Sequence, residues 1–217
     1  MHPMSMYYTI KISDSVSRSY NGINLFCAMT DVTIKTNYTL DMFLQQLESR
    51  ISMSKEVLKD HPVVRALRDF YWRMGIDPTK TRPSSEALAR RFLTSKSIPK
   101  INSVVDAGNI ASIETLVPIG IYDANKIVGD VLLRLASNEE EFTDISNERH
   151  LLHGKEIVLS DSNGVMHVFP YRDAFRTRVN EDTKKVLIVG CGVPGIEQGL
   201  TKTAVDRTLE LINIIGA

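Results

Sequence analysis

Cysteine is scarce in this sequence of 217 residues, since only Cys27 and Cys191 occur. Two thiols are too few for the disulfide framework of a small secreted protein, and both stand in apolar runs, which is typical of free buried thiols. No apolar run approaches the roughly 20 residues that a membrane span needs, and the first residues lack the pattern of a secretory signal. We therefore expect a cytoplasmic protein with no membrane segment.

The sequence also has no excess of charge of one sign. Its 26 lysines and arginines balance 26 acidic residues, so the formal net charge is zero. Any attraction to nucleic acid must then come from a local patch rather than from the whole chain. Hydrophobic residues make up 43% of the chain, which is enough for a sizeable core. Because no repeat or linker divides the sequence, we expect a single domain over residues 1–217.

Most common signatures of cofactor or nucleophile chemistry are missing as well. The run from Gly190 to Gly195 matches G-x-G-x-x-G, but a dinucleotide site needs another parallel strand beyond the following helix, and we interpret the run as a turn. His150 and His153 are too few ligands for a metal, and His61 and His167 stand alone. No G-x-S-x-G elbow occurs. We expect no metal and no cofactor, and the catalytic residues stay unknown.

Periodicity and turn signals predict alternating helices and strands along the chain. Asn138 to Glu148 is rich in acids and is expected to be a solvated loop, while Pro118 and Gly120 are expected to turn the chain. Arg134 lies among leucines and therefore needs a carboxylate partner or a ligand. The expected helices cover residues 40–53, 62–74, 85–95, 101 onward and 196–215, and the expected strands cover residues 6–12, 23–34, 126–128, 130–136, 155–160, 165–170 and 185–191.

The stretch from Arg82 to Asn109 concentrates the unusual polar residues. Asn102, Asp106 and Asn109 are spaced by four and three residues, so they are expected to share one helix face. Two interpretations stay open for them, capping of helix ends or the lining of a small polar pocket. Basic residues also gather here against a single acid, Glu86, and form either a solvated face or an anion-binding patch. They are Lys80, Arg82, Arg90, Arg91, Lys96 and Lys100.

An ordered series of motifs over roughly residues 60–215 resembles a known family. The motifs are Arg82 to Leu93, Asn102 to Asn109, Pro118 to Asp123, Leu133-Arg134, Gly154 to Glu156, Asp161 and Thr183. Together they resemble the B3/B4 tRNA-binding domain of the phenylalanyl-tRNA synthetase beta chain and its free-standing relatives. The resemblance implies an α/β fold of the α+β type, in which helices flank a central mixed sheet that carries a cleft, and residues 1–55 add strands and a helix.

The same resemblance implies a function. In the full synthetase the cleft is an editing site that hydrolyses tyrosine wrongly esterified to the phenylalanine tRNA, by placing a water against the ester carbonyl. The expected partner is therefore tRNA or aminoacyl-tRNA. By this resemblance Arg82 would meet phosphate or carboxylate, Asn102, Asp106 and Asn109 would shape the pocket, and Arg172 or Thr177 would line its far wall. The synthetase's other modules are absent, so the chain is not a complete synthetase.

Two departures from that family pattern keep the function open. Gly120 stands where the synthetase domain has its editing-site histidine, and residues 173–176 replace a Gly-Gly pair and a glutamate. Either the pocket takes a different aminoacyl group, or hydrolysis is lost and a binding pocket remains. The alternative is a small-molecule or amino-acid binding protein that kept the cleft without using tRNA. Zero net charge favours this alternative, because phosphate contacts dominate affinity for nucleic acid.

Overall fold

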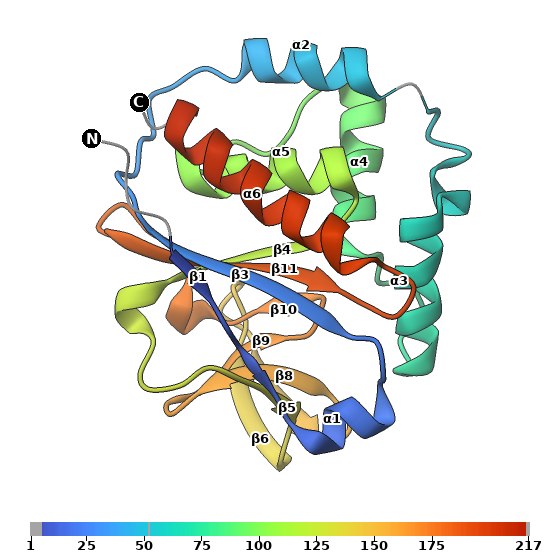
Figure 1. Ribbon diagram of the computed structural model, residues 1–217, viewed down its shortest axis with the longest axis vertical. Helices are drawn as coiled ribbons and strands as arrows, with labels where there is room; N and C mark the ends of the chain where they lie inside the picture. Colours follow the sequence, from blue (N-terminus) through green and yellow to red (C-terminus); the bar gives the residue numbers. More distant parts are fainter. Residues whose placement is uncertain (1–5, 52, 216–217) are drawn as a thin grey trace.

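A computed structural model describes residues 6–51 and 53–215 of the chain. Its centre is a four-stranded sheet in the order β1-β3-β11-β4, whose neighbours all run antiparallel. Helices cover one face of this sheet, and the remaining strands lie on the other side (Figure 1). The four strands are β1 (Met6–Tyr8), β3 (Asn24–Asp31), β11 (Lys185–Gly192) and β4 (Ile119–Asp123).

A second sheet of five strands has the order β10-β9-β8-β5-β2. The predicted hairpin around Asn163 is confirmed, because β8 and β9 pair across Asp161 and Gly164. The strands are β10 (Arg172–Asp173), β9 (Gly164–Val168), β8 (Ile157–Asp161), β5 (Leu132–Leu135) and β2 (Lys11–Ile12). This sheet supplies one wall of the site described below.

The helices begin where the sequence places capping residues. His61 and Pro62 open α3, and the side chain of Asn102 accepts hydrogen bonds from two backbone N–H groups at the start of α5. No helix in residues 6–51 and 53–215 is both long and apolar enough to cross a membrane. The helices are α1 (Asp14–Ser19), α2 (Asp41–Arg50), α3 (Pro62–Arg73), α4 (Ser84–Ser95), α5 (Ser103–Thr115) and α6 (Gln198–Ile215), with short 3-10 turns η1 (Leu58–Asp60), η2 (Ala124–Lys126) and η3 (Phe175–Thr177).

Three local predictions are wrong. Residues 118–120 do not turn the chain but lead into β4, and residues 124–126 form η2 where a strand over 126–128 was expected. The predicted turn near residue 20 is confirmed, but it is preceded by α1, which was not predicted and is capped by Ser13. In the predicted helix over 40–53, α2 ends at Arg50, and residue 52 lies outside the described residues.

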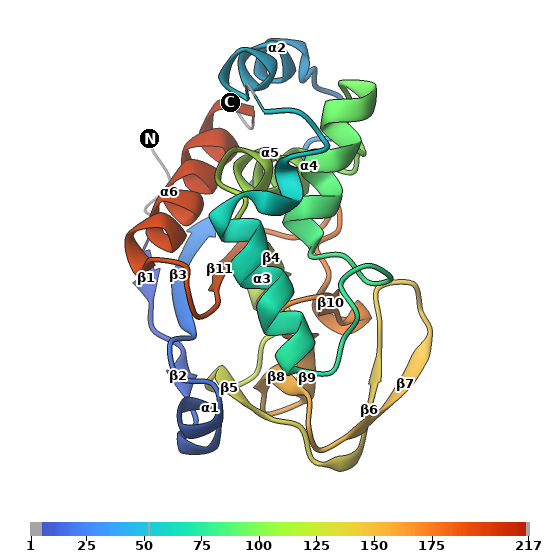
Figure 2. The same ribbon diagram turned by 90° about the vertical axis from the view of Figure 1, so that its right-hand side faces the viewer.

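The third error concerns the acidic segment expected to be a solvated loop. It forms a hairpin of β6 (Asn138–Thr143) and β7 (Arg149–His153), which projects beside the two main sheets in Figure 2. The side chains of Phe142 and Leu152 are buried and give the hairpin a small apolar face. One acidic residue of the hairpin pairs with Arg134: the guanidinium donates hydrogen bonds to both carboxylate oxygens of Glu140 at 2.8 and 2.6 Å. The expected carboxylate partner of Arg134 is thus confirmed.

A buried carboxylate ties α4 to α3. Glu86 is fully buried, and its oxygens accept hydrogen bonds from Arg68 at 2.8 Å twice and from Arg90 at 2.9 Å. Burial raises the pKa of Glu86, but the bonds from the two arginines outweigh this effect and hold the pKa below its ordinary value. The arrangement fixes the start of α4, from which Ser84 and Leu88 reach the site.

Replacing this carboxylate by an amide is expected to destabilise the fold. Glu86→Gln leaves two partly buried arginines without a counter-charge, so the free energy of unfolding at neutral pH should fall by about 3–5 kcal/mol. Because the folded-state pKa is lowered, the wild-type contribution is fully present above about pH 4.3 and is lost as the pH falls through the lowered value. Urea unfolding of both proteins across this pH range measures the difference.

The matched control is Glu48→Gln. Glu48 pairs with Lys96 at 3.1 Å, but both side chains are about half exposed. Exposed pairs contribute about 0–1 kcal/mol, so this variant should unfold nearly as the wild type does. Equal stability losses in the two variants would contradict the role given to Glu86.

Candidate functional site

A cavity of about 460 Å³ opens between α5, β4 and the segment that runs from β10 through η3. Its walls are mainly aliphatic, with Ile101 and Val105 on one side and Ile121 and Val179 on others. Gly108 of α5 packs against the end of β4, where an added Cβ would lie 2.6 Å from Ile121 Cδ1. The volume and the apolar lining suit a single amino-acid side chain.

A second, smaller cavity of about 130 Å³ adjoins the first. Both cavities are lined by Asn109, Ile119 and Asp173, so these residues mark the junction. The smaller cavity is more polar and reaches His167 and Gly120. A molecule with an apolar side chain and a polar end therefore finds a matching surface in each part.

A histidine and a carboxylate lie side by side in the wall of the smaller cavity. His167 of β9 and Asp173 of β10 are directly opposite each other in the antiparallel register. The His167 Nδ1 atom lies 2.7 Å from Asp173 Oδ1. His167 is only 5% exposed, and its Nε2 atom has no hydrogen-bond partner in the described part of the chain. An unpaired buried polar atom is costly, so it marks a position where a ligand can be recognised.

A buried tyrosine hydroxyl lies nearby. Tyr122 of β4 is buried, and burial together with the neighbouring carboxylate of Asp173 raises the pKa of its hydroxyl well above the ordinary value. Its ring meets the imidazole of His167 edge-on, with 6.2 Å between centroids. The hydroxyl lies over Gly120, where an added Cβ would come within 2.2 Å of the oxygen. A side chain at position 120 is therefore excluded as long as Tyr122 keeps this place.

Among the described residues that line the two cavities, none is an activated nucleophile. Cys191 lines the smaller cavity but is 1% exposed, and burial raises the pKa of its thiol well above the ordinary value. The hydroxyl of Ser112 donates to the carbonyl of Val117 at 2.8 Å and has no base beside it. Any hydrolysis in this site would therefore use a bound water.

Two of the six residues predicted for the site make only internal contacts. Asn102 caps α5 through bonds of 3.1 and 2.9 Å from the N–H groups of Val104 and Val105. Asp106 is fully buried, accepts from the hydroxyl of Tyr38 and the N–H of Ile101, and has a pKa that burial raises. These bonds match the capping interpretation. The two side chains line neither cavity, because α5 begins only at Ser103 and turns its other face to the site.

Asn109 and Thr177 are placed differently. Asn109 lines both cavities and lies at their junction, which agrees with the pocket interpretation for this residue. Thr177 lies in η3 directly before Arg178, which lines the larger cavity, and is fully buried with an unpaired hydroxyl. The structure thus brings Asn109 to the site and leaves Thr177 behind its wall.

The two predicted arginines lie outside both cavities. Arg82 is exposed two residues before Ser84, at the edge of the smaller cavity. Arg172 precedes Asp173 in β10 and points to the opposite side, because side chains alternate along a strand. Several other basic residues of the stretch 80–100 have internal partners, namely Glu86 for Arg90, Glu48 for Lys96 and the carbonyl of Tyr38 for Lys100. The arginine that lines the larger cavity is Arg178.

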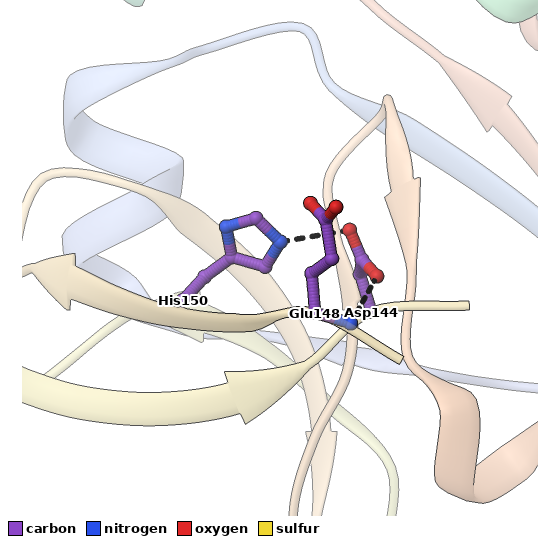
Figure 3. A group of neighbouring side chains, drawn as sticks. All are labelled: Asp144, Glu148 and His150. Atoms are coloured by element: carbon purple, nitrogen blue, oxygen red, sulfur yellow. Dashed lines mark hydrogen bonds and ion pairs between the residues drawn. The ribbon is translucent and has the colours of Figure 1, made fainter. Parts of the chain in front are cut away.

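One group in the described residues has the composition of a metal site. Asp144, Glu148 and His150 offer ligand atoms within 4.8 Å of one another (Figure 3). Asp144 already accepts two backbone N–H groups and lies 2.7 Å from His150 Nε2. The guanidinium of Arg172 lies 2.9 and 3.0 Å from the two ring nitrogens of His150. A cation is thus already supplied by the protein, and we assign no metal here.

The fold and the site together define an α/β protein with a mainly apolar cavity that adjoins a smaller polar one. The sequence matches the model of the B3/4 domain over residues 66–216, and the chain belongs to that family.

Curated relatives agree with this membership. The chain is 29% identical over 194 residues to the phenylalanine-tRNA ligase beta subunit of Tropheryma whipplei, a match that covers 81% of this chain and 20% of that subunit. It is 27% identical over 117 residues to the same subunit of Mycoplasma genitalium, covering 53% of this chain and 14% of that one. The chain therefore spans a fifth or less of the length of these relatives.

A solved structure is also similar. It is an N-terminal fragment of the phenylalanyl-tRNA synthetase beta subunit from Pyrococcus horikoshii, at a TM-score of 0.45 and 15% sequence identity. The match covers 94% of this chain and 52% of that fragment.

Sequence reasoning missed three residues of the site. His167 was expected to be an ordinary surface or core histidine, yet it is paired with Asp173. Tyr122 entered only as part of a motif. The sequence did contain a signal for His167 and Asp173. The Asn-Gly turn fixes β9, and a tight turn after Pro170 brings residue 173 back beside residue 167.

The burial of both thiols predicts that neither reacts in the folded protein. Burial raises the pKa of Cys27 from the ordinary value of 9.0 to about 12, which leaves roughly 10³-fold less thiolate, and burial shifts the pKa of Cys191 in the same direction. Alkylation with iodoacetamide at pH 8, followed by mass spectrometry, should modify neither cysteine in buffer and both in urea. Rapid modification of native Cys191 would show that the smaller cavity holds a reactive thiol.

Proposed function

We propose that this chain binds the aminoacylated end of a tRNA and hydrolyses the ester when the attached amino acid fits the cavity. Membership of the B3/4 family and the name of the relatives, phenylalanine-tRNA ligase, support a link to tRNA. On this proposal residues 1–217 work as one domain in the cytoplasm, where charged tRNA is made.

The observation that carries the proposal is the pair of joined cavities. The larger, aliphatic one accepts the amino-acid side chain, and the smaller, polar one accepts the ester group. At the junction the carboxylate of Asp173 and the amide of Asn109 face the α-ammonium group, which needs an anion and hydrogen-bond acceptors when it leaves water. An aminoacyl ester carries these three features in this order.

A positive group stands at the wall of the larger cavity. The guanidinium carbon of Arg178 lies 3.3 Å from the ring centroid of Phe175, so the arginine is stacked on an aromatic face. Stacked arginines keep their charge and their outward donors for phosphate. Exposed Arg82, near Ser84 of the smaller cavity, is the second candidate for a phosphate contact.

The second candidate function is binding of a free amino acid or a related small molecule without tRNA. Its specific support is the zero formal net charge, since non-specific tRNA affinity rises with basic surface. The same cavities would serve, with Asp173 on the ammonium group. Salt dependence separates the two functions, because pocket binding of a small ligand releases few counterions.

Binding of total tRNA, charged and deacylated, tests the first function. We expect the charged pool to bind about tenfold more tightly, equivalent to ~1.4 kcal/mol from the acyl group in the cavity. Filter binding should show affinity falling steeply between about 50 and 200 mM salt. Binding of neither pool, together with salt-independent binding of a free amino acid in calorimetry, would favour the second function instead.

Substitutions at the junction and at the wall should have separable effects. Asn109→Leu fills the junction and should abolish the preference for charged tRNA while leaving deacylated tRNA binding unchanged. Arg178→Gln should weaken binding of both pools and lower the salt slope by about one. The matched controls are Asn213→Leu on the exposed face of α6 and Arg18→Gln in α1, which line neither cavity. Equal effects of variants and controls would contradict the assignment of the site.

A further inference from the structure

We propose that the outer face of α3 binds the unpaired end of the tRNA, with the indole ring of Trp72 stacked on a base. The identity of the partner rests on the proposed function. The surface lies outside the two cavities, and it adds a base contact to the phosphate contacts assigned above.

Trp72 is the one tryptophan of the chain, and it is 56% exposed in the last turn of α3. The two aromatic residues before it, Phe70 and Tyr71, are buried. The ring of Trp72 makes no aromatic or cation–π contact with the described residues. Because burial is what makes a large apolar ring stabilising, this exposed indole adds little to the fold, and its face is open to a partner.

A groove of about 350 Å³ lies on the same side of α3. Its walls include Arg65, Asp69 and Arg73 of the helix, and Gly195 in the turn before α6. Trp72 is three residues from Asp69, so the two side chains are neighbours on the helix surface. The volume suits a single nucleoside, and the carboxylate of Asp69 can accept a hydrogen bond from a ribose hydroxyl.

The helical repeat places Trp72 between this groove and the smaller cavity. At about 100° per residue, Trp72 lies on the same stripe of α3 as Arg65, and Arg68 and Tyr71 follow on the next side. Arg68 donates to the buried carboxylate of α4 at 2.8 Å. The ring of Tyr71 lies 6.1 Å, centroid to centroid, from Tyr171, which lines the smaller cavity. α3 itself faces the viewer in Figure 2.

Residues 62–91 concentrate positive charge in a chain whose net charge is zero. Seven basic side chains occur there against three acidic ones. Glu86 is already paired with Arg68 and Arg90, and the carboxylate of Asp77 accepts the N–H and the hydroxyl of Thr79 within its own turn. The charge of this surface therefore complements a polyanion.

Two arginines of this surface have no internal partner. The side chains of Arg65 and Arg82 are exposed and make no hydrogen bond or ion pair with the described residues. Arg65 shares the stripe of Trp72, and Arg82 precedes Ser84 at the edge of the smaller cavity. Cations that hold the backbone, together with an aromatic ring on which bases stack, are the combination by which proteins bind single-stranded nucleic acid.

The fluorescence of Trp72 tests the stacking, because no other tryptophan contributes to it. Total tRNA should quench the emission of the full chain over the concentrations at which filter binding detects the complex. The same tRNA, after a nuclease has removed its unpaired 3′ nucleotides, should quench much less. Equal quenching by both samples would overturn the contact with the unpaired end. An emission that changes with protein concentration alone would show that a second copy covers this face, and would also overturn the proposal.

Substitutions measure what the stacked ring contributes. Trp72→Leu should weaken tRNA binding about 5- to 100-fold, and Trp72→Tyr should restore most of the affinity, because its ring also stacks. Arg65→Gln should lower the salt slope by about one. The matched control is Tyr7→Leu, which removes a 59% exposed aromatic side chain from β1 and should bind tRNA as the wild type does. Unchanged urea unfolding of Trp72→Leu would show that the loss is one of binding.

The outcomes separate this surface from the proposed function. Binding of tRNA with unchanged emission, and with wild-type affinity in Trp72→Leu, would overturn the surface and leave the proposed function standing. Binding of a single-stranded RNA oligonucleotide that depends on Trp72, without any preference for charged tRNA, would support the surface and refute the proposed function. Binding of neither tRNA nor the oligonucleotide would overturn both.

Discussion

The pairing of β11 with two neighbours holds the molecule together. On one side it pairs with β3 over eight residues, and on the other with β4 over five. The first strands of the chain, a strand from its middle and a strand near its end thus become one surface. Seven of the eight residues of β11 are buried, so after the exposed Lys185 the strand is apolar on both faces. α5 and α6 pack against each other over one face of this sheet.

The site depends on the edge of the same sheet. β4 is an outer strand, and Tyr122 projects from it toward His167 of the five-stranded sheet, whereas Ile119 and Ile121 face Gly108 of α5. The β9–β10 hairpin supplies His167 and Asp173 from the opposite side, and α5 closes the space with Asn109. Three elements that are distant in sequence are therefore needed to form the two cavities, and each of them contributes a polar side chain to the walls.

Much of the fold follows from local sequence, and the reason is visible in the elements themselves. The helices with capping residues and regular apolar spacing, such as α3 and α5, were predictable, as was the β8–β9 hairpin with its Asn-Gly turn. β4 was not, because a proline and a glycine at its start carry turn signals that a tertiary contact overrides. The β6–β7 hairpin was hidden by exposed acids, since its apolar face consists of little more than Phe142 and Leu152.

Residues of the site could be predicted only where their place follows from the spacing or capping rules of the helix that carries them. Asn109 falls at the right interval on α5, and Asn102 follows the rule for caps. His167 and Asp173 are six residues apart in sequence. Their pairing depends on the register of β9 and β10, which is set by the turn between them, and the periodicity of the sequence does not encode the geometry of that turn. Arg172 shows the same limit, because one residue of difference along β10 turns its side chain to the other face.

The contact between Gly120 and the hydroxyl of Tyr122 makes substitutions at these two positions depend on each other. A larger residue at 120 and a tyrosine at 122 claim the same volume. Among descendants of a common ancestor the two sites must therefore change in a fixed order: the aromatic ring shortens or turns away first, and only then does a side chain appear at 120. A family tree of such chains would show this as a one-way dependence between neighbouring columns, and grafting a residue from one branch into the other would fail unless its companion moved with it.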